Sequence, residues 1–84
     1  AALLTRMLAD QCDLHAREVV WTGGDVHLYL NHAELVEQQL ARTPAGAPTL
    51  HILRKAEDIF SYRFEDFAVQ DYHPQAHIAA PVAV

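Results

Sequence analysis

Two side chains in one short segment have the types and the spacing to bind a small polar ligand. His27 and Tyr29 are two residues apart, in a stretch where Val26, Leu28 and Leu30 alternate with them. Successive side chains of a strand point to opposite faces, so we expect His27 and Tyr29 on one face and an anchored apolar face opposite. Imidazole and phenol groups both donate and accept hydrogen bonds. The pattern alone also fits a half-exposed strand face with ordinary polar residues.

The surrounding segment resembles a known family. Residues 21–32 read Trp-Thr-Gly-Gly-Asp-x-His-x-Tyr-x-Asn-His, which is similar to a segment of the thymidylate synthases. Two further stretches agree in order: Ile-Phe-x-Tyr-Arg-Phe-Glu-Asp-Phe at residues 59–67 and Ile-x-Ala-Pro-Val-Ala-Val at residues 78–84. Three ordered patterns are far more specific than one short motif. The resemblance runs over residues 1–84, and we expect the C-terminal portion of a single thymidylate synthase domain.

The resemblance implies a fold and an activity. The expected fold is α+β, with helices packed on a mixed β-sheet, and the expected assembly is a homodimer. The intact enzyme would be a methyltransferase of nucleotide biosynthesis that converts dUMP to dTMP. Methylenetetrahydrofolate would supply the one-carbon unit and the hydride.

The resemblance also implies roles for two groups of residues. In the family, the residues that match His27 and Tyr29 bind the 3′-hydroxyl of the nucleotide's deoxyribose. The tail that matches Val82, Ala83 and Val84 closes over the folate. Without the resemblance, these last residues would be read as a frayed chain end.

The catalytic nucleophile of the family is expected outside this chain. That cysteine lies in a Pro-Cys-His context upstream of everything present here, whereas Cys12 lies between Gln11 and Asp13 in a predicted helix. We therefore assign Cys12 a structural or incidental role. The family's phosphate-binding arginines and its base-reading asparagine are expected upstream as well. We predict that the isolated chain is inactive.

Two alternative functions stay open on the sequence. A deoxypyrimidylate hydroxymethylase of the same fold differs in its base-reading residue, which this chain does not contain. A non-catalytic interaction module that kept a synthase-like sequence belongs to another class of protein. An upstream reading frame with a Pro-Cys-His motif would favour the enzyme, and a start codon directly before Ala1 would favour the module.

The composition of the chain indicates which partners, location and metals to expect. The 84 residues allow one small domain, and the net charge of −5 with scattered basic residues argues against nucleic acid or an anionic membrane as partner. No apolar run reaches the ~20 residues of a membrane-spanning helix. The single cysteine excludes an internal disulfide and fits a reducing, cytoplasmic location. The six histidines follow no metal-ligating spacing, so we expect no metal.

Hydrophobic periodicity predicts the elements that must position these residues. We expect Asn31 to cap the second helix, with Glu34 completing a capping box. The expected elements are a helix over residues 3–14, extended segments over 18–22 and 25–30, a helix to about residue 42, a loop over 43–48, a strand over 49–53, a helical turn over 56–62, a strand over 63–72 and an irregular tail over 73–84, which we expect to dock on the rest of the chain.

Overall fold

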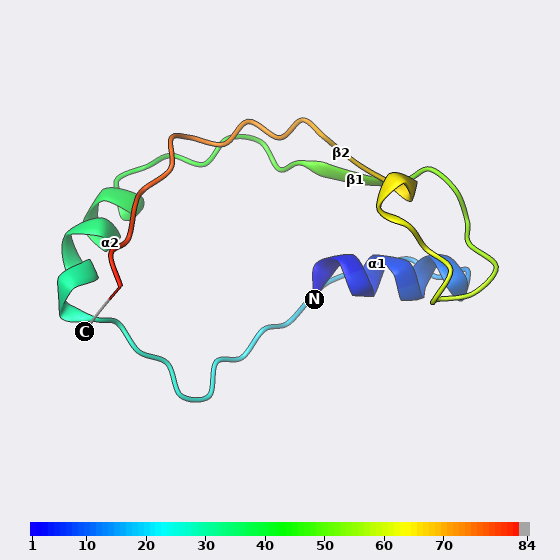
Figure 1. The fold of residues 1–84 in the computed structure, drawn as a ribbon, viewed down its shortest axis with the longest axis horizontal. Coiled ribbons are helices and arrows are strands. Elements are labelled where there is room, and N and C mark those ends of the chain that lie inside the picture. The colour runs from blue at the N-terminus through cyan, green and yellow to red at the C-terminus, as the bar shows by residue number, and fades with distance from the viewer. Residues whose placement is uncertain (83–84) are drawn as a thin grey trace.

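A computed structural model describes residues 1–82 of the chain, which form an open ring of short elements (Figure 1). The elements in chain order are α1 (Ala2–Gln11), the 3-10 helix η1 (Leu30–His32), α2 (Ala33–Leu40), β1 (Thr49–Ile52), the 3-10 helix η2 (Phe64–Asp66) and β2 (Phe67–Gln70). Helices and an antiparallel sheet in one small chain are compatible with an α+β class.

The sheet described here is a two-stranded antiparallel pair. Strand β1 pairs with β2 so that Leu50 lies opposite Val69 and Ile52 lies opposite Phe67. Leu50 and Ile52 are half-buried, whereas Thr49 and His51 are exposed, which is the alternation that a sheet with one covered face requires. The predicted strand over 49–53 is confirmed over Thr49–Ile52, and that over 63–72 is confirmed over Phe67–Gln70, whereas Phe64–Asp66 forms a 3-10 helix.

Helix α1 ends three residues earlier than its apolar pattern suggests. Asp13 has φ 53°, in the left-handed region that aspartate tolerates better than most residues. The Leu14 N–H donates to the Ala9 carbonyl at 2.8 Å, which closes the Schellman motif that typically ends a helix. The chain therefore turns away at Asp13, and Leu14 is the apolar residue that follows the motif.

Helix α2 begins differently from the prediction. Its N-cap is His32, which makes no side-chain capping bond, and η1 precedes it directly. The expected capping box of Asn31 and Glu34 is wrong, because Asn31 already lies inside η1 and is not at the cap position. The predicted end of this helix near residue 42 is close to the observed one at Leu40.

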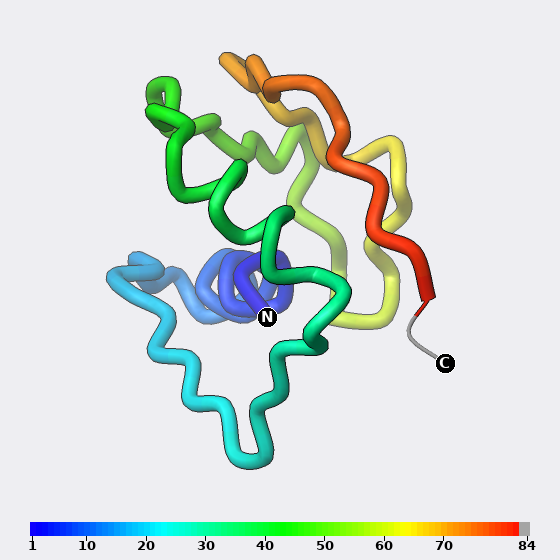
Figure 2. The backbone as a smooth tube through the Cα atoms, turned by 90° about the vertical axis from the view of Figure 1, so that its left-hand side faces the viewer, coloured from blue at the N-terminus to red at the C-terminus, as the bar shows by residue number. Residues whose placement is uncertain are grey.

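The two extended segments expected before α2 do not form strands. Within residues 1–82, no backbone hydrogen bonds pair residues 18–30 with a neighbouring strand, and Figure 2 shows this part as a projecting loop. A β-rich sequence marks a segment that fits a pleated surface, so it forms a strand only where a neighbour is present. The expected burial of Val26, Leu28 and Leu30 is wrong for the same reason, since all three are exposed.

The helical turn expected over residues 56–62 is also absent. Bends and a turn occupy residues 57–60, and a single 3-10 turn forms later, at Phe64–Asp66. The Asp58 side chain accepts hydrogen bonds from the Phe60 N–H at 2.9 Å and from the Ser61 hydroxyl at 2.8 Å. Aspartate that bonds the backbone two residues ahead stabilises a turn in place of a helix.

Candidate functional site

His27 and Tyr29 lie on the projecting loop, and both side chains are accessible. The His27 side chain is 64% exposed, and its Nε2 lies 3.5 Å from Asp25 Oδ1. Asp25 lies in the bend that includes Gly24 and is two residues from His27, which brings the two side chains close together. The carboxylate can orient the imidazole by a charge-assisted contact when the ring carries a proton at Nε2.

Tyr29 has a different neighbour. Its ring meets the His32 ring edge to face, with centroids 5.7 Å apart and planes at 81°. Such edge contacts between aromatic rings are favourable because the positive edge of one ring meets the negative face of the other. The Tyr29 backbone is extended at φ −73° and ψ 141°, directly before η1. The His32 ring therefore packs against Tyr29, a contact that no pattern in the sequence predicts.

The glycine pair beside these residues has unequal surroundings. A Cβ added to Gly23 would overlap the Val26 side chain and would lie 2.8 Å from the Trp21 ring at Cη2. A Cβ added to Gly24 would meet nothing within 4 Å. Gly23 is therefore required by the close approach of these two side chains, whereas a Cβ at Gly24 would have open space in the described structure.

The tail packs along α2, as expected for a docking segment. The Arg42 guanidinium donates to the Ala76 carbonyl at 2.8 Å, and His32 Nε2 lies 2.6 Å from the Pro81 carbonyl oxygen. Val82 is 85% exposed. Ala83 and Val84, the other two residues expected to cover the folate, lie outside the described residues.

Between the tail and α2 lies an apolar groove of about 360 Å³. It is lined by Leu28, His32, Leu35, Val36, Gln39, Leu40, Ile78 and Ala80. Leu28 precedes Tyr29, so the groove adjoins the candidate site on the side of the projecting loop.

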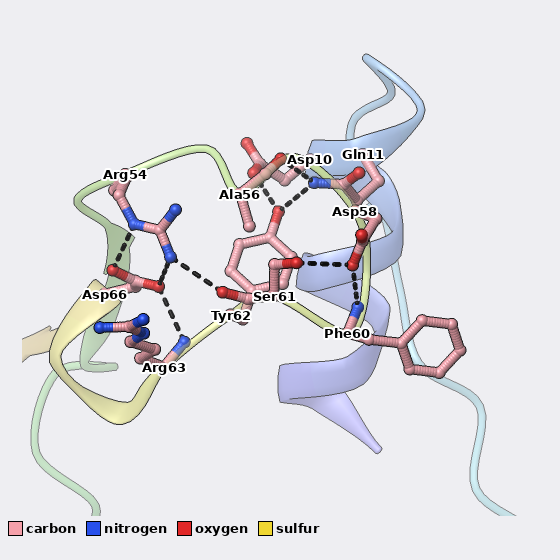
Figure 3. A network of polar contacts seen from close by, with 10 residues as sticks. All are labelled: Asp10, Gln11, Arg54, Ala56, Asp58, Phe60, Ser61, Tyr62, Arg63 and Asp66. Carbon is pink, nitrogen blue, oxygen red and sulfur yellow. Dashed lines mark hydrogen bonds and ion pairs between the residues drawn. The ribbon is translucent and has the colours of Figure 1, made fainter.

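A second polar cluster, which sequence reasoning missed, joins the two strands (Figure 3). Asp66 is 7% exposed and receives two hydrogen bonds from Arg54, at 2.9 Å from Nε and 2.6 Å from Nη2. The Arg63 backbone N–H donates to the same carboxylate at 2.8 Å. The Arg54 hydrogen bonds, followed by that from Arg63, hold the pKa of Asp66 below its ordinary value. The signal available in the sequence was a pair of opposite charges, with Arg54 directly after the first predicted strand and Asp66 within the second.

A third contact fastens α1 to the connection between the strands. The Tyr62 hydroxyl donates to the Asp10 carboxylate and accepts a hydrogen bond from Gln11 Nε2 at 3.0 Å. Gln11 also donates to the Ala56 carbonyl at 2.8 Å. Partial burial, together with the hydrogen bond to Asp10, raises the pKa of Tyr62. Figure 3 shows this ring between α1 and the Arg54–Asp66 pair, so the contact links helix to sheet.

Other candidate sites are not assembled in the part of the chain that is described. No group of three or more His, Cys, Asp and Glu side chains there is arranged to hold a metal ion. No helix among these residues is long and apolar enough to cross a membrane. Cys12 is exposed at the end of α1 and pairs with no other cysteine, since the sequence has only one.

Comparison with known proteins decides the family. The family model described as thymidylate synthase matches residues 1–84. The chain belongs to the thymidylate synthase family. It is 77% identical over all its 84 residues to the thymidylate synthase of Sphingopyxis alaskensis, and 64% identical to that of Novosphingobium aromaticivorans. The chain spans 27% of the length of each of these relatives.

Family membership confirms the resemblance carried by residues 21–32, 59–67 and 78–84. It gives the candidate site a context: His27 and Tyr29 lie in an exposed loop of a thymidylate synthase sequence, next to a tail that follows α2. The structure brings Tyr29, His32 and Pro81 together, and it brings His27 to Asp25. The roles of His27, Tyr29 and the tail residues stay predictions.

Proposed function

We propose that this chain is part of a thymidylate synthase that methylates dUMP to dTMP. The identity of 77% to a curated thymidylate synthase, sustained over the whole chain, carries the proposal. Methylenetetrahydrofolate would supply both the one-carbon unit and the hydride. The expected setting is the full α+β fold of the family, with helices on a mixed sheet, in a cytoplasmic homodimer that needs neither nucleic acid, membrane nor metal. The 84 residues would form the C-terminal portion of one domain.

His27 and Tyr29 would bind the 3′-hydroxyl of the deoxyribose. A hydroxyl group donates one hydrogen bond and accepts others, so an imidazole and a phenol can both engage it. Their exposure on the loop supports the assignment, because both rings remain accessible to a ligand. Two such bonds, shielded from water in the complete site, would contribute about 1–3 kcal/mol.

Val82, Ala83 and Val84 would close over the folate. Covering a reacting ring system excludes water from the transfer step, which is a common use of a mobile lid. The attachment of the preceding tail residues to α2 supports this role, because it brings the end of the described tail to the start of α2, where η1 and Tyr29 lie.

The nucleophile would come from a part of the enzyme other than these residues. Cys12 lies at the C-terminal end of α1, and the candidate nucleotide-binding side chains lie on the loop before η1. A cysteine thiolate that attacks the pyrimidine would have to contact the bound base, and Cys12 is not in the family's Pro-Cys-His context.

The test is the product made by the full-length protein that contains this segment. The purified protein is incubated with dUMP and methylenetetrahydrofolate, and in parallel with dCMP, and the nucleotide product is identified by its mass. We expect dTMP, together with dihydrofolate. A hydroxymethyl nucleotide would identify the hydroxymethylase instead, and a folded protein without turnover would favour the interaction module. The names of the two relatives favour the synthase.

A further inference from the structure

Three hydrogen bonds from side chains to backbone carbonyls hold the tail against α2 and the residues that directly follow it. Gln75 Nε2 donates to the Thr43 carbonyl at 2.9 Å, Arg42 Nη2 to the Ala76 carbonyl at 2.8 Å, and His32 Nε2 to the Pro81 carbonyl at 2.6 Å. Because later tail residues meet earlier residues of α2, the tail runs antiparallel to the helix, as Figure 1 shows. The first two bonds lie just after the end of α2, and the third lies at its N-cap, His32.

His32 makes the last of these bonds and also contacts the candidate site. It is the final residue of η1 and the N-cap of α2, so its backbone is held between two helical turns. Its half-buried ring meets Tyr29 edge to face while Nε2 faces the Pro81 carbonyl oxygen. Since that oxygen only accepts, the imidazole nitrogen must carry the hydrogen.

The apolar groove between the tail and α2 shows what the hydrogen bond from His32 adds to the packing of the tail. Ile78 and Ala80 of the tail line it together with Leu35 and Val36 of α2. Apolar contact holds these segments together but is not directional. Pro81 has no backbone N–H, so its carbonyl is its only backbone hydrogen-bonding group. The bond from His32 therefore fixes the direction in which the chain leaves the groove.

We propose that His32 is a positioning residue that holds Pro81 beside Tyr29 and thereby directs the end of the chain toward the bound substrates. The inference rests on the proposed function, in which Tyr29 binds the nucleotide and the residues after Pro81 cover the folate. It adds a residue to which neither the sequence pattern nor the comparisons give a role. His32 acts through the tail, by a hydrogen bond, and does not contact the reacting atoms.

Two substitutions in the full-length protein separate the hydrogen bond from the packing of the ring. His32→Phe keeps an aromatic ring against Tyr29 and removes the donor. His32→Gln removes the ring and keeps an amide N–H that can reach the position of Nε2. Gln75→Ala is the matched control, because it removes a bond of the same kind at the far end of the tail's contact with α2.

The readouts are the dissociation constant for dUMP, kcat/KM for methylenetetrahydrofolate, and the rate at which carboxypeptidase removes the last residues. In His32→Phe we expect kcat/KM for the folate to fall about three- to tenfold, the loss typical of one hydrogen bond, and carboxypeptidase to act faster. The dUMP dissociation constant should stay within about twofold of that of the unmodified protein. His32→Gln and Gln75→Ala should retain most of the folate kcat/KM.

The reverse pattern, with His32→Phe active and His32→Gln impaired, would show that the ring only packs and would overturn the inference. Unchanged kcat/KM in His32→Phe would do the same. An equal loss of dUMP binding, folate kcat/KM and thermal stability would show a general structural role, which also contradicts a positioning role. Failure of the proposed function is distinguishable, because the unmodified protein itself would then make no dTMP.

Discussion

The surroundings of His27 and Tyr29 are compatible with the ligand-binding role proposed for them, because each side chain has one neighbouring contact and remains accessible. Asp25 lies near the imidazole, and the His32 ring touches the phenol at its edge. Both contacts orient a ring without satisfying every hydrogen-bonding group on it. The alternation in the sequence named this pair as candidates, and their role stays a prediction. It was not sufficient to find His32, because an edge contact and a bond to a distant proline leave no pattern in the sequence.

The first prediction concerns the binding of the sugar. In the full-length protein, the double variant His27→Ala with Tyr29→Ala should bind dUMP more weakly by about 1–3 kcal/mol, because two hydrogen bonds are lost. The dissociation constant for dUMP, measured by titration calorimetry, gives the result. His51→Ala with Tyr72→Ala removes another exposed histidine and tyrosine and serves as the control. Equal affinity in the two double variants would remove the assignment.

The second prediction concerns the glycine pair. Gly23→Ala must displace the Val26 side chain or the Trp21 ring, whereas Gly24→Ala meets open space in the described structure. Forcing a methyl group into occupied space costs about 1–3 kcal/mol. We expect Gly23→Ala to lower the thermal unfolding midpoint of the full-length protein by several degrees relative to Gly24→Ala. Equal midpoints would show that Trp21 and Val26 do not approach Gly23 in the assembled protein.

Among the elements, the β1–β2 pair is held by a charge pair as well as by its ladder. Arg54 follows β1, and Asp66 directly precedes β2, so their double hydrogen bond closes the connection between the strands. Arg54 also donates to the Ser61 carbonyl at 2.9 Å, inside that connection. A bidentate pair of this kind is geometrically specific. The element therefore depends on the ionisation of Asp66.

The third prediction gives the pH dependence of this element. The pKa of Asp66 in the folded protein lies below its ordinary value of 3.8, because its charged form receives hydrogen bonds from Arg54 and Arg63. Its contribution to stability is therefore complete above that value and is lost as the pH falls through the folded pKa. Asp66→Asn should lower the unfolding midpoint at pH 7, and its difference from the unmodified protein should shrink below about pH 4.

Thermal scans of the full-length protein between about pH 3 and pH 7 measure this difference. Glu65→Gln changes an exposed neighbouring carboxylate and is the matched control. A stability difference for Asp66→Asn that stays constant over the whole range would contradict the assigned role of its charge.

The elements also show where sequence patterns succeed and where they fail. The helices around Met7 and Val36 and the strands around Leu50 and Val69 follow their local periods, because their defining hydrogen bonds lie within the element or to a nearby partner. The segments before α2 have β-rich sequence but no described partner, so periodicity predicted strands that do not form. The prediction for the start of α2 was wrong for a local reason. Asn31, the residue expected to cap this helix, lies inside η1.

At the scale of the whole molecule, the described chain is open and has little core. Its radius of gyration is 17.1 Å, whereas a compact domain of this length would have about 12 Å. Among residues 1–82, only Ala56 and Asp66 are buried. Large apolar side chains such as Trp21, Leu30, Phe60 and Phe64 are more than three-quarters exposed. Exposed apolar area of this extent is typical of surfaces that pack against another part of a protein.

The fourth prediction is that the isolated 84-residue chain neither folds compactly nor turns over dUMP. A two-stranded sheet is marginally stable by itself, and the unpaired edges of β1 and β2 invite association. We expect X-ray scattering to give a radius of gyration well above 12 Å or one that rises with concentration, and we expect no detectable dTMP. The full-length protein, assayed in parallel, shows what an active sample gives. A compact monomer with measurable turnover would mean that these residues contain a complete active site. The assignment of the nucleophile to another part of the enzyme would then fail, and Cys12 would have to be reconsidered as the thiol that attacks the base.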